Sequence, residues 1–393
     1  MVAPLKVGIA GLGTVGSAVV RLIEQQRGAL SARCGRGVRV VAVAARSKAK
    51  KRDVDLTDIA WAKDALALAN DPGIDCFVEL MGGADDPARS AIEAALKSGK
   101  SVVTANKALI AKHGLRLASL AEQHGGALNY EAAVGAAIPV IKTLREGLAG
   151  TAINRDIAQK LSILASLAFG TRIAQSAVYV EGISSIAPED LRAAEELGYR
   201  VKLLGVAVRT SKGIEQRVRP TMVPKTSSIA QVMGVTNAVT IDGDGIAPLT
   251  LVGPGAGGAA TASAVVADIA DVASGTRALP FGRPSAKLHE TKKAPMERHE
   301  GGYYIRLMAR DFAGTAATIA TRLAEQKISI ESIVQRHPNG KLDTDESDTP
   351  MSPVPVLLIT YATSEDAVHR ALHAVRADKV ITGRPQVIRI EKN

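Results

Sequence analysis

Residues 7–26 read VGIAGLGTVGSAVVRLIEQQ, in which a short apolar run enters a cluster of glycines and a helical pattern leaves it. The run Leu5–Ala10 predicts a buried parallel strand, and the apolar residues after the glycines recur at helical spacing. The spacing G-x-G-x-x-G is formed by Gly11, Gly13 and Gly16. The first glycine permits a tight turn, the second lets a pyrophosphate approach the backbone, and the third lets the helix pack closely on the strand. This turn predicts dinucleotide binding at the helix N-terminus, and a plain strand-to-helix turn is the alternative.

Strand and helix patterns alternate after this turn. Further strands are predicted at Val38–Ala44, Asp75–Met81, Ser101–Thr104 and Ala127–Tyr130. Helices are predicted between them at Pro87–Lys97 and Gly114–His124. The alternation predicts an α/β fold with a doubly wound parallel sheet of the Rossmann type.

The residues after the second predicted strand bear on whether the chain prefers NAD or NADP. Residues 44–52 read AARSKAKKR, and Arg46, Ser47 and Lys48 occupy the place where an NAD-preferring site carries an acidic residue. A 2′-phosphate would meet cations and a hydroxyl there. The residues therefore predict a preference for NADP over NAD, and a solvated run of charges is the alternative.

Composition excludes several classes of protein. The chain has 393 residues, of which 46% are hydrophobic and 3% aromatic, and this composition suits α/β layers. The net charge of +10 suits anionic ligands, but aromatic platforms and a nucleic-acid motif are missing, so we expect no nucleic-acid partner. We see neither a secretory signal nor a membrane span. Cys34 and Cys76 are too few for a disulfide framework, and we expect reduced thiols in the cytoplasm.

Several further motifs together resemble the homoserine dehydrogenase family. They are SVVTANKAL at 101–109, YEAAVGAAIPVI at 130–141, KLSILASLAFG at 160–170 and GPGAGGAATASAVVADI at 253–269. With the glycine turn they follow the family's order over nearly the whole chain. The resemblance implies an NAD(P)-dependent enzyme that interconverts L-homoserine and L-aspartate 4-semialdehyde in the synthesis of threonine and methionine.

The resemblance also implies catalytic and substrate-binding residues. Lys160 would be the proton donor, Lys107 would lie near cofactor and substrate, and Asp156 would contact homoserine. Oxidising an alcohol needs a hydride acceptor and a base, and a lysine can serve if a nearby cation or burial lowers its pKa. Two neighbouring lysines could depress one another in this way. From the residues alone, an ordinary surface ion pair between Asp156 and Lys160 is the alternative.

Cofactor and cation contacts complete the expected site. Cofactor contacts are expected at Gly11, Gly13, Thr14, Val15, Gly16, Arg46, Lys48, Thr104, Lys107 and Gly255. The resemblance implies a monovalent cation, usually sodium, held by main-chain oxygens of Glu131, Val134, Ala136 and Ile138. The family commonly has glycines at 136 and 137, so alanine would be strained if the backbone there has a positive φ. A structural turn without metal is the alternative.

The sequence departs from the family between Gly150 and Asp156. Family members usually carry a few dozen further residues here, including a glutamate that binds the amino group of the substrate. Ser227 and Ser228 also replace a more usual His-Pro pair. Two alternatives therefore stay open: an impaired or regulatory member of the family that binds cofactor without this turnover, and another NADP dehydrogenase acting on a small amino-acid aldehyde.

The expected organisation has three domains. Residues 1–135 would bind NAD(P), and residues 136–290 would form an α+β catalytic and dimerisation domain, shortened near 150–156. A linker is expected at 291–301, followed at 302–393 by a βαββαβ unit that is similar to an ACT domain. Its usual D-x-P-G motif reads Asp311-Phe312-Ala313-Gly314 here. Threonine is the expected effector, a dimerisation module that senses nothing is the alternative, and the assembly is expected to be a homodimer or homotetramer.

Overall fold

The chain forms two compact units. The computed structural model describes residues 2–147, 152–154, 157–243, 246–294, 300–310, 312–335 and 353–391. The first unit comprises Met1–Tyr179, Gly205–Arg217 and Val232–Lys293, and the second comprises Val180–Leu204, Val218–Gln231 and Ala294–Asn393. The three-domain division with a linker at 291–301 stays a prediction.

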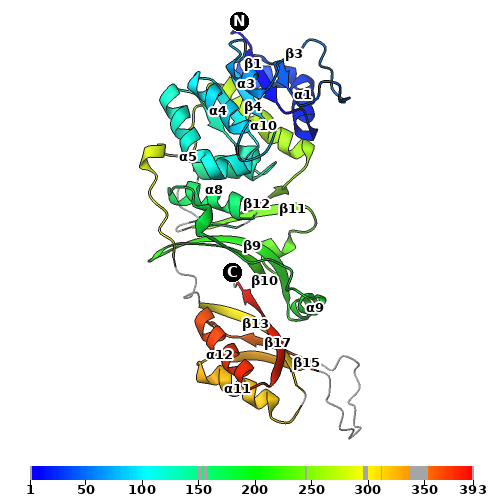
Figure 1. The fold of residues 1–393 in the computed structure, drawn as a ribbon, viewed down its shortest axis with the longest axis vertical. Coiled ribbons are helices and arrows are strands. Elements are labelled where there is room, and N and C mark those ends of the chain that lie inside the picture. Colours follow the sequence, from blue (N-terminus) through cyan, green and yellow to red (C-terminus); the bar gives the residue numbers. More distant parts are fainter. Residues whose placement is uncertain are drawn as a thin grey trace. The chain divides into compact units, whose positions relative to one another are not determined.

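The first unit contains a six-stranded sheet in the order β3-β2-β1-β4-β5-β6 (Figure 1). The strands are β1 Leu5–Ala10, β2 Val38–Ala44, β3 Ala60–Trp61, β4 Cys76–Glu79, β5 Ser101–Thr104 and β6 Leu128–Asn129. Every neighbouring pair is parallel. This order is that of a Rossmann sheet, which confirms the predicted fold class. The ligand side of such a sheet is the edge where its strands end.

Helices accompany this sheet. They are α1 Thr14–Gln25, α2 Arg27–Cys34, α3 Ala65–Asn70, α4 Ala88–Lys97 and α5 Lys107–His124. The strands that they cover carry fully buried apolar residues, among them Val7, Ile9, Val78 and Val103. Continuous apolar strands are typical of a parallel sheet that is covered on both faces.

Helix α5 begins seven residues earlier than predicted, so the expected start at Gly114 is wrong. The start is set by Asn106, whose side-chain oxygen accepts a hydrogen bond of 3.1 Å from the Leu109 N–H. Gly114 lies inside the helix, at a point where a Cβ would lie 3.2 Å from Ile173 and 3.3 Å from Phe281. Close packing, and not a helix start, explains this glycine.

The rest of the first unit consists of the loop after β6, several helices and a second group of strands, some of which pair antiparallel. The helical elements are α6 Glu131–Val134, α7 Val140–Lys142, the π-helical turn Thr143–Gly147, α8 Ile157–Phe169 and α10 Gly258–Ala273, with short 3₁₀ turns at Gln175–Ala177 and Ser285–Lys287. The strands are β7 Ala152–Asn154, β8 Val178–Val180, β9 Tyr199–Thr210, β10 Gly213–Pro224, β11 Thr236–Gly243 and β12 Ile246–Pro254. Strands β8, β9 and β10 each have residues in both units, since Val180, residues 199–204 and residues 218–224 belong to the second. Strand β11 pairs antiparallel with β12 and β7, and β7 pairs antiparallel with β9. Helix α10 packs against α1, which brings residue 258 to the glycine turn.

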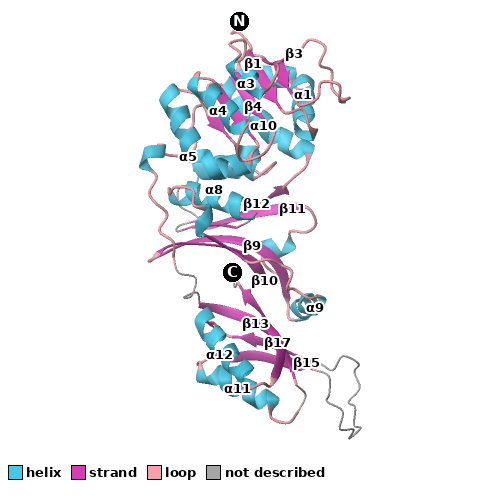
Figure 2. Ribbon diagram, viewed as in Figure 1, coloured by secondary structure: helices cyan, strands magenta, loops and turns pink. Residues whose placement is uncertain are grey.

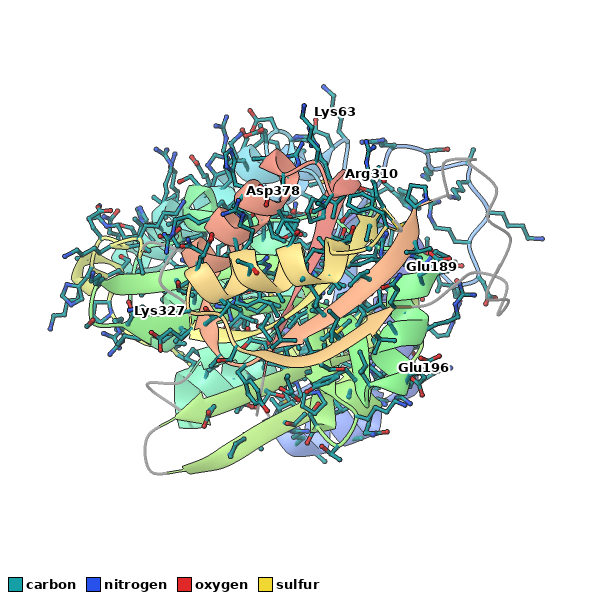
Figure 3. All side chains as sticks on the ribbon, turned by 90° about the horizontal axis from the view of Figure 1, so that it is seen from below. Lys63, Glu189, Glu196, Arg310, Lys327 and Asp378 are labelled. Atoms are coloured by element: carbon teal, nitrogen blue, oxygen red, sulfur yellow. The ribbon has the colours of Figure 1, made fainter. Side chains whose placement is uncertain are left out.

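The second unit contains the expected order of strand, helix, two strands, helix and strand (Figure 2). Its elements are β13 Glu300–Ala309, α11 Thr315–Glu325, β14 Ile330–Gln335, β15 Val354–Thr360, the short β16 Thr363–Ser364, α12 Glu365–Ala377 and β17 Ile381–Ile390, together with α9 Pro188–Glu196 and a 3₁₀ turn at Ser228–Gln231. The sheet order is β17-β13-β15-β14. Helices α11 and α12 pack together. Arg322 on α11 donates at 2.7 and 2.9 Å to Asp378, the residue after α12 that is labelled in Figure 3.

A buried carboxylate holds α9 within the second unit. Asp190 is fully buried and accepts hydrogen bonds from the Tyr304 hydroxyl at 3.0 Å and from Arg306 Nε at 2.7 Å. The same carboxylate accepts the Ala187 N–H at 2.8 Å, which caps the helix. Asp190 therefore links the start of α9 to β13.

Within the residues that the structure describes, no helix is both long enough and apolar enough to cross a membrane.

Candidate functional site

The glycine turn between β1 and α1 has a distinct geometric role for each glycine. Gly11 has φ +103°, and a Cβ there would lie 2.6 Å from the carbonyl group of Leu80. A Cβ at Gly16 would lie 2.0 Å from the Gly11 carbonyl oxygen. At Gly13, the N-cap of α1, no described atom lies within 4 Å of the Cβ position. The turn therefore needs its first and third glycines for folding, whereas the second borders open space at a helix N-terminus.

A second glycine loop lies beside this turn. A Cβ at Gly258 would lie 2.8 Å from Thr14 Cγ2, so the start of α10 meets the start of α1. A Cβ at Gly255 would lie 1.8 Å from the Asn237 side-chain nitrogen, so any larger residue there would require the Asn237 side chain to move. The Ala137 N–H donates to the Pro254 carbonyl at 3.4 Å. The fold thus gathers the glycine turn, the loop 253–258 and the loop after α6, which are far apart in sequence.

A buried carboxylate that the sequence analysis did not single out organises the ends of β4 and β5. The Thr104 hydroxyl donates to Glu79 Oε2 at 2.6 Å, and Glu79 Oε1 accepts the Met81 N–H at 2.7 Å. Asn106 donates from its N–H to Thr104 Oγ1 at 3.0 Å and from its side chain to the Gly83 carbonyl at 2.6 Å. These bonds position the first turn of α5, where the exposed Lys107 lies. An acidic residue at the end of a buried strand was the available signal for Glu79.

The predicted proton donor is buried. Lys160 lies on α8 and is 6% exposed, and α8 packs against α5 and α6. An amine with so little exposure is unlike the surface ion pair that was the alternative, because lysine is almost never buried to this extent without a partner or a role. Asp156 lies outside the described residues, so its contact with substrate stays a prediction.

The residues predicted to bind a cation form a closed turn. Glu131, Val134, Ala136 and Ile138 are each 3–4% exposed. The Glu131 carboxylate accepts the Ile141 N–H at 2.8 Å and the Lys142 N–H at 2.9 Å, which ties the two ends of the turn together. The Ile138 carbonyl accepts the Val140 N–H at 2.8 Å, and a carbonyl oxygen retains a second lone pair after one such bond.

Ala136 has φ +48°, which is the strained condition considered for alanine at this position. We expect Ala136→Gly to raise the free energy of unfolding by ~0.5 kcal/mol, because relief of a left-handed alanine, ~1 kcal/mol or more, exceeds the added entropy of the unfolded chain. Ala137→Gly is the matched control and is expected to lower stability, since Ala137 is outside the left-handed region. Urea unfolding of both variants measures this, and a loss of stability in Ala136→Gly equal to that of the control would contradict it.

Two buried carboxylates, those of Glu131 and Asp268, lie at the predicted cation turn. Burial raises the pKa of Asp268 to about 7, and the charge of Glu131 adds to the effect. Burial likewise raises the pKa of Glu131, against the hydrogen bonds that its carboxylate accepts. Lys142 Nζ lies 3.6 Å from Asp268 and 2.5 Å from Asp271, and it partly compensates these carboxylates. Asp268 also accepts the Glu131 N–H at 2.9 Å, which attaches α10 to the turn.

The two thiols are free, as expected, and take no part in this arrangement. Burial raises the pKa of Cys76 to about 12, so its thiol is unreactive.

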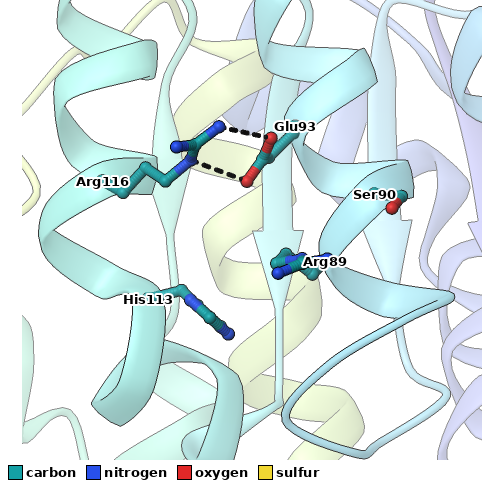
Figure 4. A pocket seen from close by; sticks show the side chains of 5 residues that line it. All are labelled: Arg89, Ser90, Glu93, His113 and Arg116. Atoms are coloured by element: carbon teal, nitrogen blue, oxygen red, sulfur yellow. Dashed lines mark hydrogen bonds and ion pairs between the residues drawn. The ribbon is translucent and has the colours of Figure 1, made fainter.

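A separate pocket of about 310 Å³ lies on α4 and α5 (Figure 4). It is lined by Arg89, Ser90, Glu93, His113 and Arg116, none of which belongs to the predicted site. Arg116 donates to Glu93 at 2.8 and 3.1 Å, so the pocket has its own internal ion pair.

Two family models match the chain: "Homoserine dehydrogenase, NAD binding domain" over residues 11–131 and "Homoserine dehydrogenase" over residues 153–270. A homoserine dehydrogenase of Pseudomonas aeruginosa is 37% identical over 443 aligned positions, which cover 99% of each chain. That alignment is longer than the 393 residues of this chain, so the relative has residues without a counterpart here.

Solved structures give the same result. A homoserine dehydrogenase from Thiobacillus denitrificans has a TM-score of 0.88 and 35% identity, covering 99% of this chain and 98% of that one. A hyperthermophilic archaeal homoserine dehydrogenase in complex with NADPH has a TM-score of 0.51 and 22% identity. It covers 68% of this chain and 97% of its own, and at this identity it shows a shared fold alone.

Proposed function

The chain belongs to the homoserine dehydrogenase family and is an oxidoreductase with a nucleotide-binding domain; from this premise we propose that it interconverts L-homoserine and L-aspartate 4-semialdehyde with NADPH as its preferred cofactor. The observation that supports this most is the open space at Gly13, which is the N-cap of α1. A pyrophosphate placed there meets backbone N–H groups and the positive end of the helix dipole.

The proposed roles of the residues follow from the chemistry. Bound NADPH supplies the hydride that converts the semialdehyde carbon into the alcohol carbon. Lys160 donates a proton to the carbonyl oxygen of the semialdehyde and removes it again in the reverse direction. Lys107, at the start of α5, orients substrate beside the cofactor, and Asp156 binds the substrate. The buried position of Lys160 excludes bulk water from the proton transfer.

The direct test is the absorbance of NADPH after addition of aspartate semialdehyde to the purified chain of verified mass. We expect NADPH consumption, and NADP reduction with homoserine in reverse. Binding of NADPH without turnover would favour an impaired or regulatory member of the family. Turnover of a different aldehyde would favour another NADP dehydrogenase that acts on a small amino-acid aldehyde.

The proposed site also includes a monovalent cation at the main-chain oxygens of Glu131, Val134, Ala136 and Ile138, which are hard donors. Equal rates of homoserine oxidation in sodium and tetramethylammonium salts would contradict this cation site.

The cofactor preference is assigned to the loop after β2. Arg46, Ser47 and Lys48 are all exposed, as a phosphate site requires. We expect the double substitution Arg46→Ala, Lys48→Ala to raise the KM for NADPH about 100-fold and to leave the KM for NADH unchanged, because charge-assisted hydrogen bonds to phosphate contribute ~1.5–3 kcal/mol each. Lys63→Ala removes an exposed cation elsewhere in the unit and serves as control. A lower KM for NADH than for NADPH in the unaltered enzyme would overturn the preference.

We assign the C-terminal βαββαβ region to an ACT-like regulatory role in a cytoplasmic homodimer or homotetramer. Gly314 has φ +91° and is the N-cap of α11, so the glycine of the D-x-P-G-like motif still forms the helix entry. We expect L-threonine to inhibit homoserine oxidation at millimolar concentration, with D-threonine as the matched control. No effect of L-threonine at these concentrations would leave a dimerisation module that senses nothing.

A further inference from the structure

One side chain, Arg52, ties the loop after β2 to the glycine turn. Its Nε donates to the Leu12 carbonyl at 3.1 Å, between the first two glycines of the turn. Its Nη2 donates to the Ser47 carbonyl at 2.7 Å, and its Nη1 to the Lys50 carbonyl at 2.7 Å. A single planar guanidinium therefore sets the distance between residue 12 and residue 47.

The same loop lies against the only tryptophan of the chain. Trp61 ends β3, which pairs with β2 through Val43. The Lys48 ammonium lies 5.6 Å from the centre of the indole ring, and the Arg52 guanidinium carbon lies 5.5 Å from it. Cation–π contacts at exposed positions contribute ~0.5–1 kcal/mol each. Lys48 is thus held beside the ring on one side of Ser47, and Arg46 adjoins Ser47 on the other.

We propose that Arg52 is a positioning residue for recognition of the 2′-phosphate of NADP, holding Arg46, Ser47 and Lys48 at a set distance from the pyrophosphate site at Gly13, with Trp61 as their support. The inference rests on the proposed NADP preference. Its physical basis is that a dinucleotide presents its 2′-phosphate and pyrophosphate on one ribose, so the two loops that receive them must keep a matching separation. Arg52 directs its hydrogen bonds to carbonyl groups of both loops and supplies that separation, whereas the phosphate contacts belong to its neighbours.

Trp61 provides a readout that does not depend on turnover, because it is the chain's single tryptophan and contacts the loop. The probes are NADP⁺ and NAD⁺, which differ by the 2′-phosphate alone. In the unaltered chain we expect saturable quenching by both, with NADP⁺ bound more tightly. In Arg52→Lys, which keeps the charge but loses the three-way fork, we expect binding of NADP⁺ to weaken about tenfold and binding of NAD⁺ to change less than twofold.

A double-mutant cycle separates positioning from direct contact. If Arg52 acts through Lys48, Lys48→Ala will cost less NADP⁺ affinity in the Arg52→Lys background than in the unaltered chain. Fully additive losses would mean that Arg52 contacts the phosphate independently, and they would overturn the proposal. Unchanged NADP⁺ binding in Arg52→Lys overturns it as well. Equal weakening of both probes, with the melting temperature retained, overturns it by showing a general role in dinucleotide binding.

The experiment also distinguishes failure of the premise. If the unaltered chain binds NADP⁺ and NAD⁺ with equal affinity, the proposed NADP preference is rejected and the proposed role of Arg52 is rejected with it. If the unaltered chain prefers NADP⁺ and only the Arg52 variant behaves unexpectedly, the proposed function stands and this inference alone is rejected.

Discussion

Lys160→Met is expected to lower kcat for homoserine oxidation about 1,000-fold, because general acid–base catalysis by a positioned side chain contributes factors of this size. Methionine keeps most of the volume of the lysine at a position that is 6% exposed, so the fold should tolerate it. The KM for NADPH should change little, since the assigned role is proton transfer. Steady-state kinetics in both directions, together with a thermal melt, measure the effect.

Three comparisons make this result specific. Lys160→Arg keeps the positive charge but cannot release a proton near neutral pH, so it should also lose most of the activity. Lys107→Met should raise the KM for homoserine more than it lowers kcat, because its proposed role is orientation. Lys97→Met removes a lysine from α4, 3.8 Å from Glu93, and should be without effect. If the kcat of Lys160→Met stays within tenfold of that of the unaltered enzyme, another group must donate the proton.

Gly13→Ala and Gly16→Ala are expected to fail in different ways. The methyl group at Gly13 meets no described atom within 4 Å, so the fold should persist, but the methyl occupies the space assigned to the pyrophosphate. We expect NADPH affinity to fall about 100-fold, corresponding to ~2.7 kcal/mol of lost backbone contacts with the phosphate. The methyl group at Gly16 would lie 2.0 Å from the Gly11 carbonyl oxygen, and such overpacking costs ~1–3 kcal/mol or more of stability.

Titration of NADPH fluorescence and thermal melting of both variants test this contrast. The expected pattern is a folded Gly13→Ala protein that binds NADPH about 100-fold more weakly and a Gly16→Ala protein with a clearly lower melting temperature. Unaltered NADPH binding in Gly13→Ala would place the pyrophosphate away from this turn. Equal destabilisation in both variants would show that Gly13 is a structural glycine after all.

Local patterns in the sequence were sufficient for much of the nucleotide-binding fold. The strands Leu5–Ala10, Val38–Ala44 and Ser101–Thr104 lie at their predicted bounds, and each is a short run rich in apolar and β-branched residues. The helix Pro87–Lys97 was predicted to within one residue. By contrast, the apolar helical pattern in this part of the sequence predicts a helix over Thr261–Ala273, whereas α10 begins three residues earlier, at Gly258. Glycine lowers helix propensity, and the contact of Gly258 with Thr14, which justifies it, is not visible in the sequence.

The candidate site divides in the same way. Residue types and motif spacing indicated the glycine turn, the cationic loop after β2 and the lysines, and the resemblance to a family supplied their roles. The supporting residues Glu79, Asn106 and Arg52 were not predicted, because each acts on a segment that is distant in sequence or on a backbone group. A side chain that hydrogen-bonds to a remote carbonyl leaves no pattern in its own neighbourhood.

The sequence by itself determined that a Rossmann sheet would form, where its phosphate-binding turn would lie and which chemical groups could serve it, since these depend on periodicity and residue type over a few neighbouring positions. Only the tertiary structure decided that Lys160 is buried, that Ala136 has a left-handed backbone and that the loops at 12, 47 and 258 meet at one edge of the sheet. Burial and backbone conformation at these points depend on which distant segments pack together, and that packing is a property of the whole folded unit.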